Sequence, residues 1–428
     1  MFILTLLSIS TLLYAGQKKI LHSTRLQRLS TAVSTVQQPP RSSVRLLVAL
    51  VEFQKDSDSQ TTGDGTFMME TNVQKMIDPP PHDTTYFRNK IKFVTNYFQK
   101  VSKGRVTISG DIVSDITLTK KMEEYSPPTN STDNKKLAQL AIETWQAVCN
   151  LNPKLDFSQY DAFVIFHAGC GRDVDLVSVL GYNPTPYDIP SLYLDSTAFA
   201  KALDTSSFQG IVLHGGATIK NTMILPETET HIVSTGLGND TLELSMNGLF
   251  AASIGSFLGL PDLFDTQTGA SGIGQYGLMD GAGFFAYNGV FPPEPSAWEK
   301  IFLGWTAPIS VSTNATNLPV PAVSSFRTGQ DTIYKIPITS SEYFLVENRS
   351  RDLAHGLHIT SVMNDGTTTM YSFAEDTNGF NYSDIYNLWG SVTDVSNYDW
   401  ALIGYHDDTT TTNQKDGGGI LIWHIDEN

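Results

Sequence analysis

One stretch decides the fold: Leu249-Phe250-Ala251-Ala252-Ser253-Ile254-Gly255-Ser256-Phe257-Leu258-Gly259-Leu260-Pro261-Asp262-Leu263-Phe264-Asp265. No charged side chain occurs between Leu244 and Leu258, so the pattern predicts a helix that is buried on all sides. Asn239 to Thr241 offer capping side chains for its start, and Gly259 is the residue type that ends helices. We therefore predict a buried helix from residues 239–241 to about Leu258.

The spacing in this helix matches a zinc-binding pattern whose reactive side chains are missing. In H-E-x-x-H-x-x-G-x-x-(H or D), two His and a third residue hold the metal, and the Glu moves protons. The corresponding residues here are, in order, Ala252, Ser253, Ser256, Gly259 and Asp262. Alanine cannot coordinate a metal, and a serine hydroxyl is a poor zinc ligand and no base near neutral pH. Asp262 is either the remaining ligand position or a hydrogen-bonding residue of the turn.

Together with three further parts of the sequence, this stretch resembles the immune inhibitor A-like family of secreted zinc metallopeptidases (peptidase family M6). These parts are residues 273–280, residues 295–305, and residues 344–349 with 419–427. The resemblance runs from about Arg45 to the last residue. It implies a zincin-like fold, hydrolysis of peptide bonds at a zinc ion, and a Met-turn in which Met279 forms the hydrophobic floor under the metal. It also implies that more chain normally follows Asn428, which makes truncation one interpretation.

The order of patterns along the chain predicts an α+β protein. A zincin-like or metzincin-like α/β catalytic-type domain is followed by a β-rich, sandwich-like region. Strand-type runs at 44–53, 105–113 and 161–167 alternate with helical spacing at 83–101 and from 133 onward. Beyond Trp305, short alternating stretches occur at 332–338, 343–347, 367–373, 400–405 and 419–425. We predict a signal peptide at 1–16, a linker or pro-segment remnant at 17–43, a metallopeptidase-like domain at 44–305 and the β-rich region at 306–428.

Composition limits the compartment and the partners. Phe2 to Ala15 is almost wholly apolar and too short to span a bilayer, which is typical of a signal peptide, so we expect a secreted protein without a membrane span. The formal net charge of −16 argues against a nucleic-acid partner. Cys149 and Cys170 could form a disulfide in an oxidising compartment or remain two buried thiols.

Few other residues could rebuild a metal site. None of the nine histidines has a histidine partner four residues away. His167 and His214 are the best placed for a cleft, and the alternative for each is a core or surface role. Asp265 and Asp280 could supply oxygen ligands to calcium.

Three hypotheses for function follow. In the first, a secreted metallopeptidase-like protein has lost catalysis, needs no cofactor and binds a peptide or protein in the retained cleft. In the second, the chain is an active zinc endopeptidase whose unusual ligand set comes from other segments. In the third, it is a surface adhesion or interaction module in which the β-rich region makes the contact.

Overall fold

The computed structural model describes residues 41–71, 76–129, 133–234, 239–266, 268–325, 332–351, 355–373, 385, 387–402 and 418–427. The predicted signal peptide and nearly all of the predicted linker, up to residue 40, lie outside the described residues. Helices and strands are mixed along the chain, which confirms the predicted α+β class. Among the described helices, none combines the length and the apolar character that a bilayer-spanning segment needs.

A mostly parallel sheet forms the centre of the molecule, with strand order β2-β1-β3-β7-β4. Its strands are β1 (Ser43–Glu52), β2 (Thr107–Thr117), β3 (Ala162–Cys170), β4 (Leu192–Leu194) and β7 (Thr222–Thr228). β1, β2, β3 and β7 run parallel, whereas β4 pairs antiparallel with β7 and forms one edge. β3 is buried along its whole length, because helices cover both faces of the sheet.

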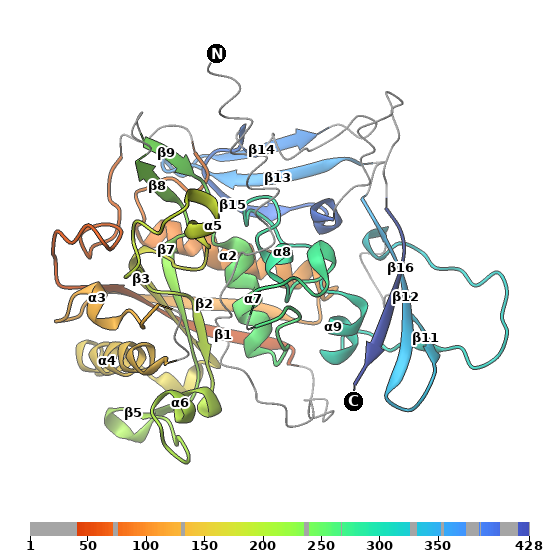
Figure 1. Ribbon diagram of the computed structural model, residues 1–428, viewed down its shortest axis with the longest axis horizontal. Coiled ribbons are helices and arrows are strands. Elements are labelled where there is room, and N and C mark those ends of the chain that lie inside the picture. The colour runs from red at the N-terminus through yellow and green to blue at the C-terminus, as the bar shows by residue number, and fades with distance from the viewer. Residues whose placement is uncertain are drawn as a thin grey trace.

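Helices pack on the two faces of this sheet in an arrangement that Figure 1 shows clearly. α2 (Thr84–Val101) and α7 (Asn247–Phe257) lie on one face, and α4 (Lys135–Leu151) and α6 (Ser196–Ala202) lie on the other. Alternation along β1 divides the core, because Leu46 and Val48 face α2 while Leu47 and Ala49 face α4. Asp83 caps α2 by accepting hydrogen bonds from the backbone of Thr85 and Tyr86.

The buried helix predicted around residues 249–265 is α7, and its start differs from the prediction. The segment predicted to begin it is instead β9 (Asn239–Leu242), which pairs antiparallel with β8 (His231–Ser234). The helix therefore begins only at Asn247. Its end is as predicted, because Gly259 adopts a φ of 104° just after the last turn.

Short helices and strands connect the elements of the central sheet and its covering helices. They are α3 (Met122–Tyr125), α5 (Leu176–Leu180), α8 (Gly281–Phe284), α9 (Ala297–Phe302), β5 (Ile211–Val212) and β6 (Thr218–Ile219). Beyond α9, one sheet has the order β14-β13-β15 and another the order β10-β11-β12-β16. Their strands are β10 (Ile309–Ser310), β11 (Tyr334–Pro337), β12 (Glu342–Ser350), β13 (Leu357–Val362), β14 (Thr368–Phe373), β15 (Ser391–Val395) and β16 (Gly418–Asp426).

The strands beyond residue 305 pack on helices, where the sequence predicted a sandwich. Ile359 of β13 and Val395 of β15 belong to the same core as α2, whereas Leu345 of β12 packs with Ala297 of α9. In Figure 1 the sheet of β11, β12 and β16 stands to one side of the molecule, away from β13 and β14. The strand predicted at 400–405 is a 3₁₀ turn up to Ala401, and residues 403–405 lie outside the described ranges. The boundary near residue 305 stays a prediction.

The two cysteines are separate buried thiols, so the disulfide considered above is not formed. Cys149 lies on α4 in the core on that side of the sheet. Cys170 ends β3, where its Sγ lies 3.5 Å from the carbonyl oxygen of Thr230. The two side chains therefore lie in different environments and have different neighbours.

Candidate functional site

Buried polar contacts fix the start of α7. The side chain of Asn247 donates to the carbonyl oxygens of Val290 and Val392, at 3.1 and 3.0 Å. Its Oδ1 accepts from Nζ of Lys90 on α2 at 3.1 Å, and the same ammonium pairs with the Asp78 carboxylate. Because all these groups are buried and paired, they hold α7 in one position relative to α2 and β15.

The residues at the zinc-pattern positions of α7 pack as a helix core. Ala252 is 5% exposed and belongs to the apolar core shared with α2. The half-buried Ser253 donates its hydroxyl proton to the carbonyl oxygen of Leu249, one turn earlier, at 2.9 Å. Ser256 is 7% exposed. None of these three side chains carries a nitrogen donor or a carboxylate.

The turn after α7 is tightly organised. The backbone N–H of Gly259 donates to Ser256, and that of Leu260 donates to Gly255, each at 3.0 Å, so the last carbonyls are satisfied. Leu263 then donates to the carbonyl of Met279 at 2.8 Å, which ties this turn to the predicted Met-turn. Asp262 is half-buried within the segment so fixed.

Met279 lies directly against α7. A Cβ added at Gly255 would lie 2.8 Å from the Met279 sulfur, so a larger residue would require the methionine to shift. The buried carboxylate of Glu299 on α9 accepts the backbone N–H of Met279 at 2.9 Å and that of Leu278 at 3.3 Å. The methionine is therefore held under the helix, at the place where the resemblance puts the floor of a zinc site.

A zinc ion of the kind that the resemblance implies does not fit the side chains present on α7. Such a site needs three protein ligands, and structural or catalytic zinc takes them from Cys, His, Asp and Glu. Ala252 offers no ligand atom, and the Ser253 hydroxyl is engaged with the helix backbone. Asp262 alone is a carboxylate.

The calcium ligands considered for this region have other roles. Oδ2 of the buried Asp280 accepts from the backbone of Gly272 at 2.7 Å and of Ile273 at 2.9 Å, and Oδ1 accepts from Ala282 at 2.9 Å. Asp265 is exposed and accepts from Thr268 within its own turn. The N–H groups that surround Asp280 contact both of its oxygens, and calcium binding by Asp265 and Asp280 stays a prediction.

His167 and His214, the histidines predicted to be best placed for a cleft, lie elsewhere. His167 is completely buried on β3, where its ring lies 6.0 Å from that of Phe53 and its Nδ1 contacts the Ala168 carbonyl oxygen at 2.9 Å. Burial lowers its pKa to about 4, so the ring is neutral at pH 7. His214 is exposed and its Nε2 contacts Asn150 of α4 at 2.9 Å.

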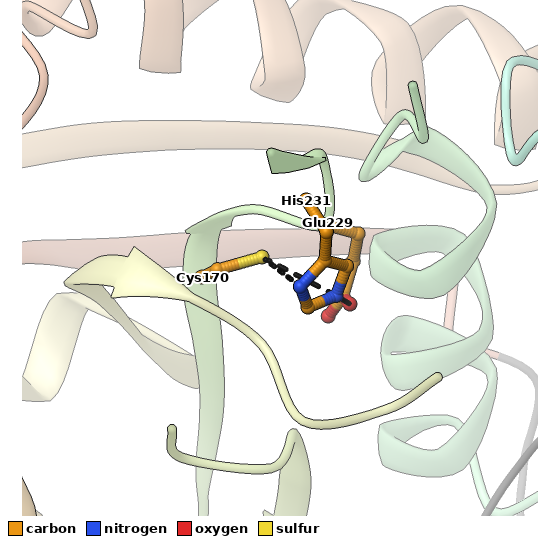
Figure 2. A group of neighbouring side chains, drawn as sticks. All are labelled: Cys170, Glu229 and His231. Atoms are coloured by element: carbon orange, nitrogen blue, oxygen red, sulfur yellow. Dashed lines mark hydrogen bonds and ion pairs between the residues drawn. The ribbon is translucent and has the colours of Figure 1, made fainter. Parts of the chain in front are cut away.

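Three buried side chains with metal-ligand chemistry meet at the end of β3, and the sequence reasoning missed them. Figure 2 shows Cys170, Glu229 and His231 pointing toward one another. One ligand atom from each lies within 4.8 Å of the others. Both ring nitrogens of His231 are 3.5 Å from Sγ of Cys170, and its Nε2 is 4.0 Å from Glu229 Oε2. We call these residues the Cys170 cluster; the alternation Glu227-x-Glu229-x-His231 was its only local signal.

The Cys170 cluster is strongly desolvated. Burial and the neighbouring carboxylates raise the pKa of the Cys170 thiol well above its usual range, and burial raises that of Glu229 in the same way. Burial lowers the pKa of His231 to about 4. Burial therefore disfavours the charged form of each of the three groups.

The two buried glutamates of this region differ in their partners. Glu227 accepts from His82 Nδ1 and from the backbone of Gly169, both at 2.7 Å. Glu229 lies against the carboxyl group of Asp173, and no other described group donates to either of its oxygens. Glu227 is thus a satisfied structural carboxylate, whereas Glu229 lacks a cationic partner.

One comparison with known proteins finds a family that resembles the first part of the chain. The sequence model described as the immune inhibitor A peptidase M6 catalytic domain matches residues 33–172, which include β1, α2, β2, α4, β3 and Cys170. α7 lies outside the matched residues, and no curated protein matches the sequence. Peptidases of this family are zinc-dependent and secreted. Over residues 33–172 the chain is similar to the immune inhibitor A-like family of M6 peptidases, which supports a metallopeptidase-like protein.

Proposed function

We propose that this secreted family member does not hydrolyse peptide bonds at α7 and that it binds a peptide or protein there. One observation carries the proposal: the three pattern positions on α7 hold Ala252, Ser253 and Ser256, although the helix still ends at a glycine turn and packs against Met279. In a zinc peptidase, the metal lowers the pKa of its bound water to about 7 and so produces the nucleophile. Two missing nitrogen ligands remove that step, and a missing carboxylate removes the proton acceptor.

The residues at the three pattern positions all act against metal binding and catalysis. Replacing even a residue that only supports a ligand costs roughly 10–100-fold in metal affinity or activity, so loss of two ligands abolishes binding at the zinc levels of cells. Each replacement is also small and uncharged, which lets the helix stay buried without stranded charge. Small, uncharged residues at these positions therefore allow the fold to be retained after catalysis is lost.

The neighbouring sheet edge supports peptide binding. β4 is the edge strand of the central sheet and lies beside α7; its three residues are buried, so a peptide would reach this edge only after the chain that covers it moves aside. An extended peptide can join such an edge by strand addition, in which main-chain hydrogen bonds supply affinity and side-chain pockets supply selectivity. The proposed ligand is therefore an extended peptide segment, free or within a protein.

One observation favours the second hypothesis, an active endopeptidase with an unusual ligand set. The Cys170 cluster offers sulfur, nitrogen and oxygen donors, as zinc enzymes do. However, Cys170 and Glu229 are completely buried and His231 is 4% exposed. A catalytic metal needs an open position that substrate can reach, so this cluster favours a structural role over peptide hydrolysis.

Restoration of the missing side chains tests the proposal. The triple variant Ala252→His, Ser253→Glu and Ser256→His should bind one additional zinc ion per chain relative to wild type, measured by metal analysis after dialysis. Wild-type protein should show no proteolysis of casein or of a random peptide library that a chelator abolishes. The variant with only Ser253→Glu serves as the control, because a base without metal ligands should gain nothing.

Two results would contradict the proposal. Chelator-sensitive proteolysis by the wild-type protein would show that a catalytic site exists. Failure of an extended peptide library to yield any ligand, while the folded state is verified by circular dichroism, would remove the peptide-binding part.

A further inference from the structure

We propose that Cys170, Glu229 and His231 bind a zinc ion that stabilises the fold, at a site distinct from the pattern positions on α7. The inference does not depend on the proposed function, because a buried stabilising ion neither requires nor supplies catalysis. It rests on the donor set, the distances between ligand atoms, the buried carboxylate and the space that a glycine provides.

The ligand atoms of the three residues favour zinc over other metals. Thiolate and imidazole together favour zinc over calcium or magnesium, which prefer oxygen ligands, and a carboxylate completes many zinc sites. Two of the three residues carry groups that become anionic ligands, and the burial of all three is typical of a closed structural site.

The distances fit tetrahedral coordination. With Zn–S near 2.3 Å and Zn–N near 2.0–2.1 Å, tetrahedral angles place sulfur and nitrogen about 3.6 Å apart. The Cys170 Sγ is 3.5 Å from both ring nitrogens of His231 and therefore lies over the face of the ring, so the imidazole must rotate to direct one nitrogen lone pair at the metal. The corresponding nitrogen–oxygen separation is about 3.4 Å, so the observed 4.0 Å between His231 Nε2 and Glu229 Oε2 needs a shift of about 0.6 Å in one flexible side chain.

The burial of the Glu229 carboxyl group supports a bound cation at this place. The group is completely buried, and apart from Asp173 no described group donates to either oxygen. A divalent ion beside this group would supply the positive charge that a buried ionised carboxylate needs. The nearby Asp173 contacts Glu229 and accepts from the backbone of Ser191 at 3.0 Å, so it is positioned as a group that supports Glu229.

Glycine at position 171 provides the space for this arrangement. A Cβ at Gly171 would lie 1.9 Å from Glu229 Oε1 and 2.9 Å from Asp173 Oδ2. The two carboxylates thus converge over the backbone that directly follows Cys170. A side chain there would push Glu229 away from the sulfur, so the local chain is shaped around the cluster.

Metal titration of the full protein tests the site. After removal of metal with a chelator, zinc should bind once per chain and raise the melting temperature. Cobalt should give the tetrahedral visible bands and the near-ultraviolet charge-transfer band of a thiolate ligand. Cys170→Ser, Glu229→Gln and His231→Gln should each weaken binding by at least about 10–100-fold, since each removes a ligand.

Matched controls separate this site from others. Cys149→Ser removes the other buried thiol, and His214→Gln removes an exposed imidazole; both should keep full binding and the thiolate band. If a ligand variant fails to fold, the cobalt spectrum of wild type and of Cys149→Ser still decides the question. Absence of stoichiometric metal, absence of the thiolate band, or binding that the three substitutions leave unchanged would overturn the proposal. Proteolysis is scored separately, so failure here leaves the test of the proposed function intact.

Discussion

For single residues, burial explains why Ser253 and His167 do not form the reactive groups that their residue types suggest in the sequence. Ser253 uses its hydroxyl on the helix backbone, and His167 fills a gap beside Phe53. Both residue types are common in catalysis, but burial and local hydrogen bonds give them structural roles here. Cys170 shows the reverse, because its environment becomes visible only when β3 and the segment after β7 are brought together.

The pKa of His167 leads to a prediction on the acid side. Its folded-state pKa is about 4, below the ordinary value of 6.5, so between these pH values the unfolded chain binds a proton that the folded chain does not. This contribution to stability is complete above pH 6.5 and is lost as the pH falls, by about 3 kcal/mol at pH 4. His167→Gln should therefore show a shallower loss of unfolding free energy between pH 6.5 and pH 4, measured by urea denaturation of metal-free protein.

The exposed residue His214 provides the comparison for this experiment. His214→Gln should keep the wild-type slope, because its side chain lies at the surface against Asn150. Equal slopes for the two variants would show that His167 is not held neutral by the fold.

Elements with a clear periodicity could be predicted from the sequence, and those defined by distant pairing could not. The strands predicted at 44–53 and 161–167 correspond to β1 and β3, and the helix at 83–101 to α2. The start of α7 was misplaced because residues 239–242 pair with β8, a contact that no local pattern shows. The Cys170 cluster was missed for the same reason, since Cys170 and His231 are 61 residues apart.

The loop before α8 provides a test at the level of one element. Asp280 accepts backbone hydrogen bonds from residues 272–274 and caps α8 through Ala282. Asp280→Asn replaces one acceptor oxygen by an amide that cannot accept, which leaves buried N–H groups unpaired and should cost about 1–3 kcal/mol of unfolding free energy. Urea denaturation measures this loss.

Adding calcium tests whether the Asp280 carboxylate binds this ion. Because the Asp280 oxygens already accept N–H groups, calcium should not change the melting temperature of the wild-type protein. A calcium-dependent rise that disappears in Asp280→Asn would show that the carboxylate binds the ion after all.

At the scale of the whole molecule, residues beyond 305 complete the core of the peptidase-like part. The side chain of Asn96 on α2 donates to the carbonyl oxygen of Thr393, and the ring of Tyr97 lies 4.8 Å from that of Tyr398. These contacts make the sheet β14-β13-β15 a support for the helix on which α7 rests. An adhesion module confined to the β-rich region would instead have its own core, as the sheet around Leu345 and α9 has.

Two matched core substitutions test this division. Ile359 on β13 and Leu345 on β12 are both completely buried strand residues, so replacement of either by alanine should cost about 2–5 kcal/mol. Because Ile359 shares its core with α2, Ile359→Ala should lower amide hydrogen-exchange protection in α2 as well as in β13 and β15. Leu345→Ala should lower protection chiefly in β11, β12 and β16 and leave α2 close to wild type. If Ile359→Ala opened only residues 357–395 and left α2 protected, the β14-β13-β15 sheet would be an independent unit, and the adhesion hypothesis would gain the separate domain that it needs.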